Sequence, residues 1–183
     1  MTTSTSSLDA EALYRDLLAQ IQSHIQSSGP TASTPVDTDK LAIVGIYSGG
    51  AWLAERLARD LALQSKPGFI DVSFYRDDYA QKGLHAEVKP TQIPFDVNGA
   101  SIILVDDVLY TGRTTRAAIN ELFDYGRPAK IMLATLVDRG GRELPIAADF
   151  AAHTADAAAY DKTCSINLQR ADDGTFSLSI DHA

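Results

Sequence analysis

The sequence has one cysteine, no long apolar run and fewer basic than acidic residues, and each scarcity removes a class of function. Cys164 is the only cysteine among 183 residues, so an intramolecular disulfide and a cysteine-based metal cluster are both excluded. No apolar run reaches the ~18 residues that span a bilayer. Residues 1–7 are polar and lack the basic and apolar regions of a secretory signal. We therefore expect a cytoplasmic protein without a membrane span.

The excess of acidic charge bears on the partners of the chain. Lys and Arg number 16 against 24 Asp and Glu, which gives a net charge of −8. This charge favours solubility and opposes unspecific attraction to nucleic acid. Hydrophobic residues are 45% and charged residues 22%, which is ordinary globular composition. We expect a single domain over residues 1–183, with residues 1–7 disordered.

Apolar runs typical of buried strands alternate with helical patterns along the chain. Strands are expected at 41–46, 69–75, 101–105 and 131–137, and helices at 8–25, after residue 50 and at 113–125. This alternation predicts an α/β fold with a central parallel sheet flanked by helices. Residues 76–99 are polar and contain two prolines, so we expect a flexible loop there. The short segments 147–152, 163–168 and 175–180 are expected to form a small antiparallel cap.

The strand at 101–105 leads into an acidic pair and a Thr/Gly turn before the next helix. A helix N-terminus presents unpaired backbone N–H groups, which can bind a phosphate. The candidate phosphate-binding residues are Tyr110, Thr111, Gly112, Arg113 and Thr114. Asp106 and Asp107 would repel a phosphate, so ribose hydroxyls or a hydrated Mg²⁺ are their natural partners. Neither G-x-x-x-x-G-K-[ST] nor G-x-G-x-x-G occurs in the chain.

Residues 102–114 resemble the motif with which type I phosphoribosyltransferases bind 5-phosphoribosyl 1-pyrophosphate (PRPP). Segments 75–78, 126–128 and 136–145 are similar to stretches of the PyrR family within that superfamily. The resemblance implies a type I phosphoribosyltransferase fold with a small hood and a flexible loop. It also implies Mg²⁺-dependent transfer of phosphoribose to uracil, giving UMP and pyrophosphate, and binding of pyrimidine-operon mRNA. We further expect a homo-oligomer, a dimer or larger.

The resemblance also implies roles for single residues. Asp106 and Asp107 would be the catalytic pair that holds the ribose 2′- and 3′-hydroxyls. The pyrophosphate-binding residues would be Ser48, Gly49, Gly50, Arg76 and Arg139, with Arg142 as an alternative to Arg139. The uracil-binding residues would be Val137, Asp138 and Ile166, and Asp138 would also reach Mg²⁺ through water. Many relatives carry arginine where Gly49 stands.

Three alternatives stay open at this point. An acidic pair before a helix is also explained as a capping arrangement, and exposed arginines often form surface ion pairs. The chain could instead be a nucleotide-sensing RNA-binding protein, although its acidic charge opposes this unless a dimer gathers Arg116, Arg127 and Lys130 on one face. It could also be a phosphoribosyltransferase for another nucleobase. The sequence identifies no general base.

Overall fold

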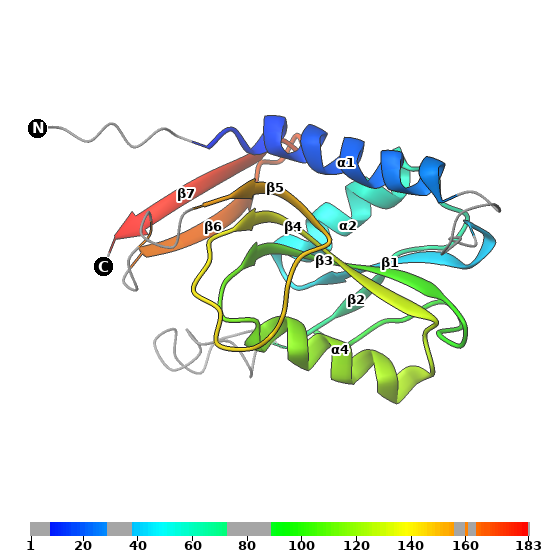
Figure 1. The fold of residues 1–183 in the computed structure, drawn as a ribbon. Coiled ribbons are helices and arrows are strands. Elements are labelled where there is room, and N and C mark those ends of the chain that lie inside the picture. The colour runs from blue at the N-terminus through cyan, green and yellow to red at the C-terminus, as the bar shows by residue number, and fades with distance from the viewer. Residues whose placement is uncertain (1–7, 29–37, 73–88, 156–159, 161–163, 183) are drawn as a thin grey trace, which may run out of the picture.

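The computed structural model describes residues 8–28, 38–72, 89–155, 160 and 164–182 (Figure 1). Its main sheet is parallel and has the strand order β2-β1-β3-β4-β5, beside which an antiparallel hairpin lies. The strands of the sheet are β1 Leu41–Ile46, β2 Gly68–Ile70, β3 Ser101–Leu109, β4 Lys130–Asp138 and β5 Phe150–Thr154. The helices are α1 Ala10–Ser27, α2 Gly49–Asp60 and α4 Arg113–Tyr125, with a 3₁₀ turn at Thr38–Lys40, and the hairpin strands are β6 Cys164–Arg170 and β7 Phe176–His182.

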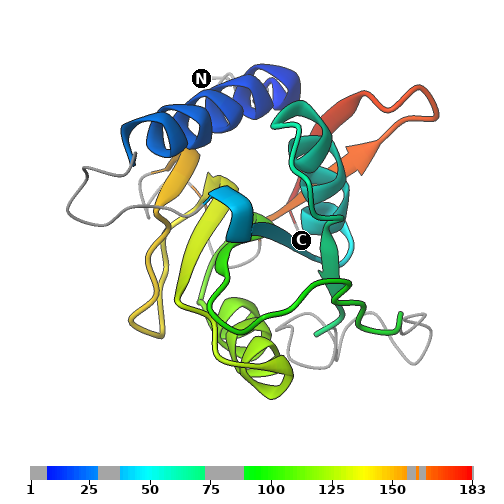
Figure 2. The same cartoon turned by 90° about the vertical axis from the view of Figure 1, so that its right-hand side faces the viewer.

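Helices cover both faces of the sheet, as the alternating pattern predicts. Helices α1 and α2 lie on one face and α4 on the other (Figures 1 and 2). Strand β3 supplies side chains to both cores, because successive residues of a strand point to opposite faces. Ile103 and Val105 pack in the core with α1 and α2, whereas Ile102 and Leu104 pack in the core with α4. The predicted α/β architecture is therefore confirmed.

The hairpin β6–β7 is the small hood that the sequence led us to expect. Its apolar side chains, among them Cys164, Leu168 and Phe176, join the core beneath α1 and α2. The backbone N–H of Phe176 donates a 2.8 Å hydrogen bond to Glu11 on α1. Burial and this polar contact together attach the hood to the helical layer.

The prediction that residues 147–152 belong to an antiparallel cap is wrong. Strand β5 pairs in parallel with β4, with Phe150 opposite Ala134, and forms an edge of the main sheet. The turn before it is fixed by Asp149, whose carboxylate accepts from the N–H of Leu133 at 2.8 Å and whose N–H donates to the carbonyl of Leu133 at 2.8 Å. Phe150 then enters the core under α1. The other two segments do form the expected antiparallel pair.

Two further boundaries differ from the sequence prediction. Strand β3 continues through the acidic pair to Leu109, because its pairing with β4 extends to Leu109 opposite Asp138. Strand β2 spans Gly68–Ile70, and residues 71–72 are not part of a strand. Residues 73–75 of the predicted strand lie outside the described residues. The predicted disorder of residues 1–7 and the predicted loop over residues 76–88 lie outside the described residues. Residues 89–99 form no helix, and Gln92 makes an isolated bridge with Phe69. Among the described helices, none is long and apolar enough to cross a membrane.

Candidate active site

Three segments that carry chemically distinctive residues meet at the carboxyl edge of the sheet. Strands β1, β3 and β4 are neighbours and run in the same direction, with Gly45 opposite Val105 and Leu109 opposite Asp138. The turn after β1, the acidic pair in β3 and the segment after β4 therefore share one edge. Ligands of open parallel sheets bind at this edge.

The acidic pair lies directly against the turn after β1. Asp106 is 6% exposed and its carboxylate accepts from the N–H of Asp107 at 3.0 Å, whereas Asp107 is half-buried. A Cβ atom at Gly49 would lie 2.5 Å from the Oδ2 atom of Asp107. A Cβ atom at Gly50 would overlap the carbonyl oxygen of Val105. Glycine at both positions thus lets the first turn of α2 approach the acidic pair closely.

The phosphate loop, which we define as residues 110–114, has the geometry expected of a helix N-terminus that approaches an anion. Gly112 caps α4 with φ of +91° and offers no side chain to the first turn of the helix. The hydroxyl of Thr111 accepts from the N–H of Arg113 at 3.3 Å. The carbonyl of Thr111 accepts from the N–H groups of Glu143 and Leu144 at 3.0 and 3.1 Å. The segment after β4 therefore holds the phosphate loop in place.

Arg113 and Thr114 complete the phosphate loop on its exposed side. The guanidinium of Arg113 bonds to Oε2 of Glu143 at 2.7 and 2.9 Å, and both side chains are about half exposed, at 52% and 53%. Thr114 is half-buried in the first turn of α4. An exposed ion pair of this kind contributes little stability, and the phosphate role of Arg113 stays a prediction.

Arg139 packs on the phosphate loop and reaches into the hood. Its guanidinium carbon lies 4.0 Å from the centre of the Tyr110 ring, and its Nη1 donates a 2.7 Å hydrogen bond to the carbonyl of Cys164. The residue is 6% exposed. In this conformation Arg139 links the end of β4 to the start of β6. Its pyrophosphate role stays a prediction, and Arg76 lies outside the described residues.

The residues predicted to bind uracil lie at the end of β4 and in the hood. Val137 is fully buried and Ile166 is 7% exposed, both in the core beneath α1 and α2. Neither side chain offers much surface to a ligand here, so a base contact at these positions would come mainly from the backbone. The carboxylate of Asp138 accepts from the N–H of Gly140 at 3.0 Å and from Nη2 of Arg142 at 2.5 Å.

Two residues beside the turn after β1 were not singled out from the sequence. Burial, with smaller contributions from Glu55 and Asp71, raises the pKa of the Tyr47 phenol. Tyr47 directly precedes Ser48 in the sequence, and the ammonium of Lys89 lies 5.0 Å from the centre of the Tyr47 ring. A lone aromatic residue and a loop lysine carry no sequence signal, and only the fold brings them to this edge.

The donor set fits Mg²⁺ bound chiefly through a ligand. The described residues contain no group of three His, Cys, Asp or Glu side chains placed to hold a metal ion. Asp106 and Asp107 nevertheless offer carboxylate oxygens at the same edge. Mg²⁺ is usually held by one or two carboxylates together with substrate phosphates and water. Asp138 bonds to Arg142, which makes it the less available carboxylate.

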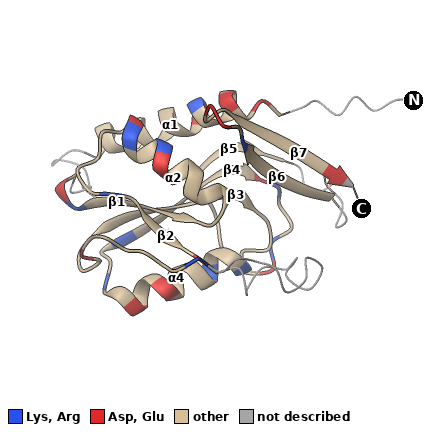
Figure 3. Ribbon diagram, turned by 180° about the vertical axis from the view of Figure 1, so that it is seen from behind, with Lys and Arg blue, Asp and Glu red and all other residues tan. Residues whose placement is uncertain are grey.

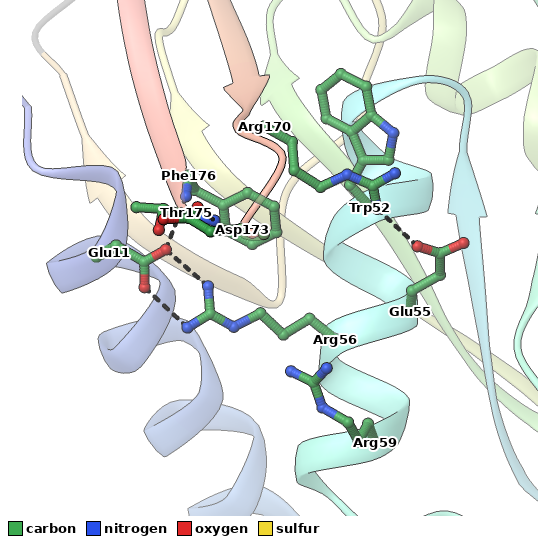
Figure 4. Close-up of a pocket in the computed structure, with 10 residues that line it drawn as sticks. Glu11, Trp52, Glu55, Arg56, Arg59, Arg170, Asp173, Thr175 and Phe176 are labelled. Carbon is green, nitrogen blue, oxygen red and sulfur yellow. Dashed lines mark hydrogen bonds and ion pairs between the residues drawn. The ribbon is translucent and has the colours of Figure 1, made fainter.

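A separate cavity of about 480 Å³ lies between α1, α2 and the turn of the hairpin (Figure 4). Its arginines are already paired: Arg56 bonds to Glu11 at 2.7 and 2.8 Å, and Arg170 bonds to Glu55 at 2.9 Å. Arg170 also stacks 5.2 Å from the Trp52 ring centre. The ion pairs that line this cavity connect the hood to α1 and α2.

Comparison with known proteins agrees with this geometry. Residues 5–157 match the phosphoribosyl transferase domain family. A hypoxanthine-guanine phosphoribosyltransferase of Bacillus anthracis, solved with HEPES in its active site, superposes with a TM-score of 0.61 over 84% of this chain and 85% of that chain, at 17% identity. The hypoxanthine phosphoribosyltransferase of Trypanosoma cruzi superposes with a TM-score of 0.59 over 81% and 80%, at 19% identity. Fold, site and family match together define a phosphoribosyltransferase.

Sequence identity to curated relatives shows which family of phosphoribosyltransferases the chain belongs to. The bifunctional protein PyrR of Ralstonia nicotianae is 57% identical over 143 residues, which are 78% of this chain and 77% of the relative. The bifunctional protein PyrR of Nitrosococcus oceani is 49% identical over 154 residues, 83% of this chain and 82% of the relative. The chain belongs to the PyrR family of phosphoribosyltransferases.

Proposed function

We propose that the protein transfers the phosphoribosyl group of PRPP to uracil, yielding UMP and pyrophosphate, and that it also acts on pyrimidine-operon mRNA as a regulator. The observation that carries the proposal is the high identity to relatives named as bifunctional PyrR proteins. The geometry of the carboxyl edge supports it, because turns suited to two phosphate groups flank an acidic pair. The cytoplasmic location, the single domain and the homo-oligomeric state expected from the sequence are part of the same proposal.

In the proposed mechanism the enzyme positions and neutralises charge rather than forming a covalent intermediate. Backbone N–H groups at Ser48, Gly49 and Gly50 hold the pyrophosphate, and the phosphate loop holds the 5′-phosphate. Asp106 and Asp107 hold the ribose hydroxyls, so that C1 stays fixed while the leaving group departs. Mg²⁺ bound through PRPP would withdraw charge from the departing pyrophosphate.

The nucleobase lies, in this proposal, against the end of β4 around residues 137–140. Uracil is small, planar and uncharged, so backbone N–H and C=O groups are suited to bind its polar edge. The backbone of Val137 and the region around Asp138 are the candidates. Lys89 is the described cation beside the turn after β1, and we propose that it supplies charge to the pyrophosphate where Gly49 offers none.

The test of the enzymatic proposal is a turnover assay of the purified protein with PRPP, Mg²⁺ and four bases in parallel. The bases are uracil, orotate, hypoxanthine and guanine, and release of pyrophosphate is the readout. We expect uracil to be preferred by at least ~100-fold, since a site that hydrogen-bonds one base leaves polar groups unpaired with another. Preference for a purine would refute the uracil assignment and leave the phosphoribosyltransferase class intact.

The net negative charge of the chain opposes RNA binding. The proposed RNA activity can therefore be tested through its dependence on salt, separately from turnover. Figure 3 shows charges of both signs along α1, and on α4 basic residues at one end and acidic residues at the other, with no continuous basic stripe along either helix. Binding should therefore depend on few phosphate contacts in each subunit. A protein making about 6 such contacts loses ~10³-fold in affinity between 50 and 200 mM salt.

Salt titration of the binding of pyrimidine-operon leader RNA, with and without UMP, tests this activity. We expect weak binding at 200 mM salt unless a dimer gathers Arg116, Arg127 and Lys130, in which case Arg116→Ala weakens it. Tight, UMP-enhanced binding that is unaffected by Arg116→Ala would refute that basic face and keep the regulatory role. Equal, weak binding to leader and unrelated RNA would refute the regulatory role.

A further inference from the structure

The guanidinium of Arg142 contacts three separate segments of the candidate active site. Its Nη1 donates to the carbonyl of Tyr110 at 2.7 Å and more weakly to that of Leu109 at 3.4 Å. Its Nε donates to the carbonyl of Ile146 at 2.9 Å, and its Nη2 bonds to Oδ2 of Asp138 at 2.5 Å. One planar group thus joins the start of the phosphate loop, the end of β4 and the segment that leads to β5.

The geometry of this group makes the junction rigid. An arginine fork fixes the directions of its N–H groups, whereas a lysine ammonium offers three donors on a flexible stem. Both Arg142 and Asp138 are mostly buried, with 23% and 16% of their side chains exposed. Burial shields this charge-assisted contact from solvent and strengthens it relative to an exposed ion pair.

Neighbouring residues of the same segment hold Tyr110 from other sides. Arg139 stacks 4.0 Å from the centre of its ring. A Cβ atom at Gly141, where φ is +78°, would lie 2.6 Å from Cε2 of the ring. Residues 138–142 and the phosphate loop are therefore packed against each other, and the Arg142 side chain hydrogen-bonds to Asp138 and to Tyr110 of the loop.

We propose that Arg142 is a positioning residue that sets the spacing between the phosphate loop and the nucleobase subsite. The proposal rests on the proposed function, in which PRPP is held through residues 110–114 and the base lies near Asp138. The base nitrogen must meet C1 of a ribose whose other end is fixed in the phosphate loop. A shift of 1 Å between two such subsites costs ~100-fold in rate. In this proposal Arg142 acts through the carbonyl of Tyr110 and the carboxylate of Asp138, to which its guanidinium donates.

Binding of two ligands to the variant Arg142→Lys separates this role from simple support of the loop. Ribose 5-phosphate occupies the phosphate loop and the ribose site at Asp106 and Asp107, whereas UMP occupies the base subsite in addition. We expect Arg142→Lys to lower the affinity for UMP at least ~30-fold and the affinity for ribose 5-phosphate less than ~3-fold. The same variant should lower kcat ~100-fold and leave KM for PRPP little changed. Arg170→Lys, which alters an exposed arginine at the distant cavity, is the matched control and should change neither ligand.

A second variant covers the case in which Arg142→Lys lowers the thermal midpoint too far to measure. Gly141→Ala presses on the Tyr110 ring and leaves Arg142 intact, and the same preferential loss of UMP is expected. If either folded variant weakens both ligands by one common factor, or behaves like Arg170→Lys, the positioning role is refuted. A wild-type protein that binds GMP in place of UMP refutes the uracil assignment, and the comparison is then made with GMP. A wild-type protein that binds no nucleoside monophosphate refutes both.

Discussion

Replacement of Gly112 by alanine should weaken both the fold and PRPP binding by a predictable amount. Gly112 has φ of +91° and ψ of −1°, a conformation that costs a non-glycine residue about 1–3 kcal/mol. A Cβ atom there would also lie 3.0 Å from Cγ1 and 3.1 Å from Cβ of Ile146. We expect a total loss of about 2–3 kcal/mol in the free energy of unfolding, which in a chain of this size lowers Tm by roughly 4–12 °C.

Gly174 provides a matched control within the same chain. It lies in the turn between β6 and β7 with φ of +87°, and a Cβ atom there would have nothing within 4 Å. Gly174→Ala therefore measures the backbone strain alone. The difference between the two variants isolates the contact with Ile146, and Ile146→Ala combined with Gly112→Ala should recover part of that difference, because neighbouring substitutions are not additive.

The functional measurement is calorimetry of PRPP binding in the presence of Mg²⁺. Gly112→Ala should reduce PRPP affinity by about 10-fold or more, since a side chain at this position strains the loop backbone and hinders the close approach of the phosphate. Gly112→Val should abolish binding, because a branched Cβ blocks the approach further. Gly174→Ala should leave affinity unchanged. Equal stability of both alanine variants, with PRPP affinity intact in Gly112→Ala, would refute both the steric and the phosphate-site reasoning.

Two other expectations concern charge. Asp107→Asn should lower turnover at least ~100-fold with Tm nearly unchanged, since it removes charge and little volume, and normal turnover with a reduced Tm would identify Asp107 as a structural cap instead. The hydrogen bond from Arg56 lowers the pKa of Glu11 below its ordinary 4.5, so the stability it contributes is present above pH 4.5 and is lost as pH falls through the lowered value. Glu11→Gln should flatten the decline of Tm between pH 5 and pH 3, and a decline as steep as that of the wild-type protein would contradict the assignment.

Residues that mark the ends of helices and strands explain which elements were predictable from the sequence. Helix α4 spans Arg113–Tyr125 as expected, because glycines at 112 and 126 mark its two ends and its apolar residues keep helical spacing. Strand β1 is likewise as predicted, since a continuous apolar run can only be buried on both sides. The phosphate loop follows from the same local signals. For these elements, neighbouring residues carry enough information to set the boundaries.

Other features depend on partners distant in the chain. The end of β3 is set by pairing with β4, which continues to Leu109, and the residues after Val105 do not reveal how far that pairing extends. Strand β5 joins the main sheet through Asp149, whose hydrogen bonds to Leu133 span 16 residues. Arg142 was predicted as an alternative contact for pyrophosphate, whereas its donors go to backbone and Asp138 oxygens of the same edge. An arginine in a motif signals importance, but its partners are decided by the fold.

The contact between Gly49 and Asp107 connects two features that the sequence presents as unrelated. The family resemblance led us to expect arginine at the position of Gly49, and its absence suggested a lost cationic contact. In the structure, any side chain at 49 must displace the carboxylate of Asp107, whose Oδ2 lies 2.5 Å from the place of a Cβ atom. Glycine here therefore admits Asp107 to the turn, and the pyrophosphate contact that we propose at the start of α2 rests on backbone N–H groups. An arginine introduced at this position would add charge only by moving the residue that we assign to the ribose, so Gly49→Arg should reduce turnover rather than improve it.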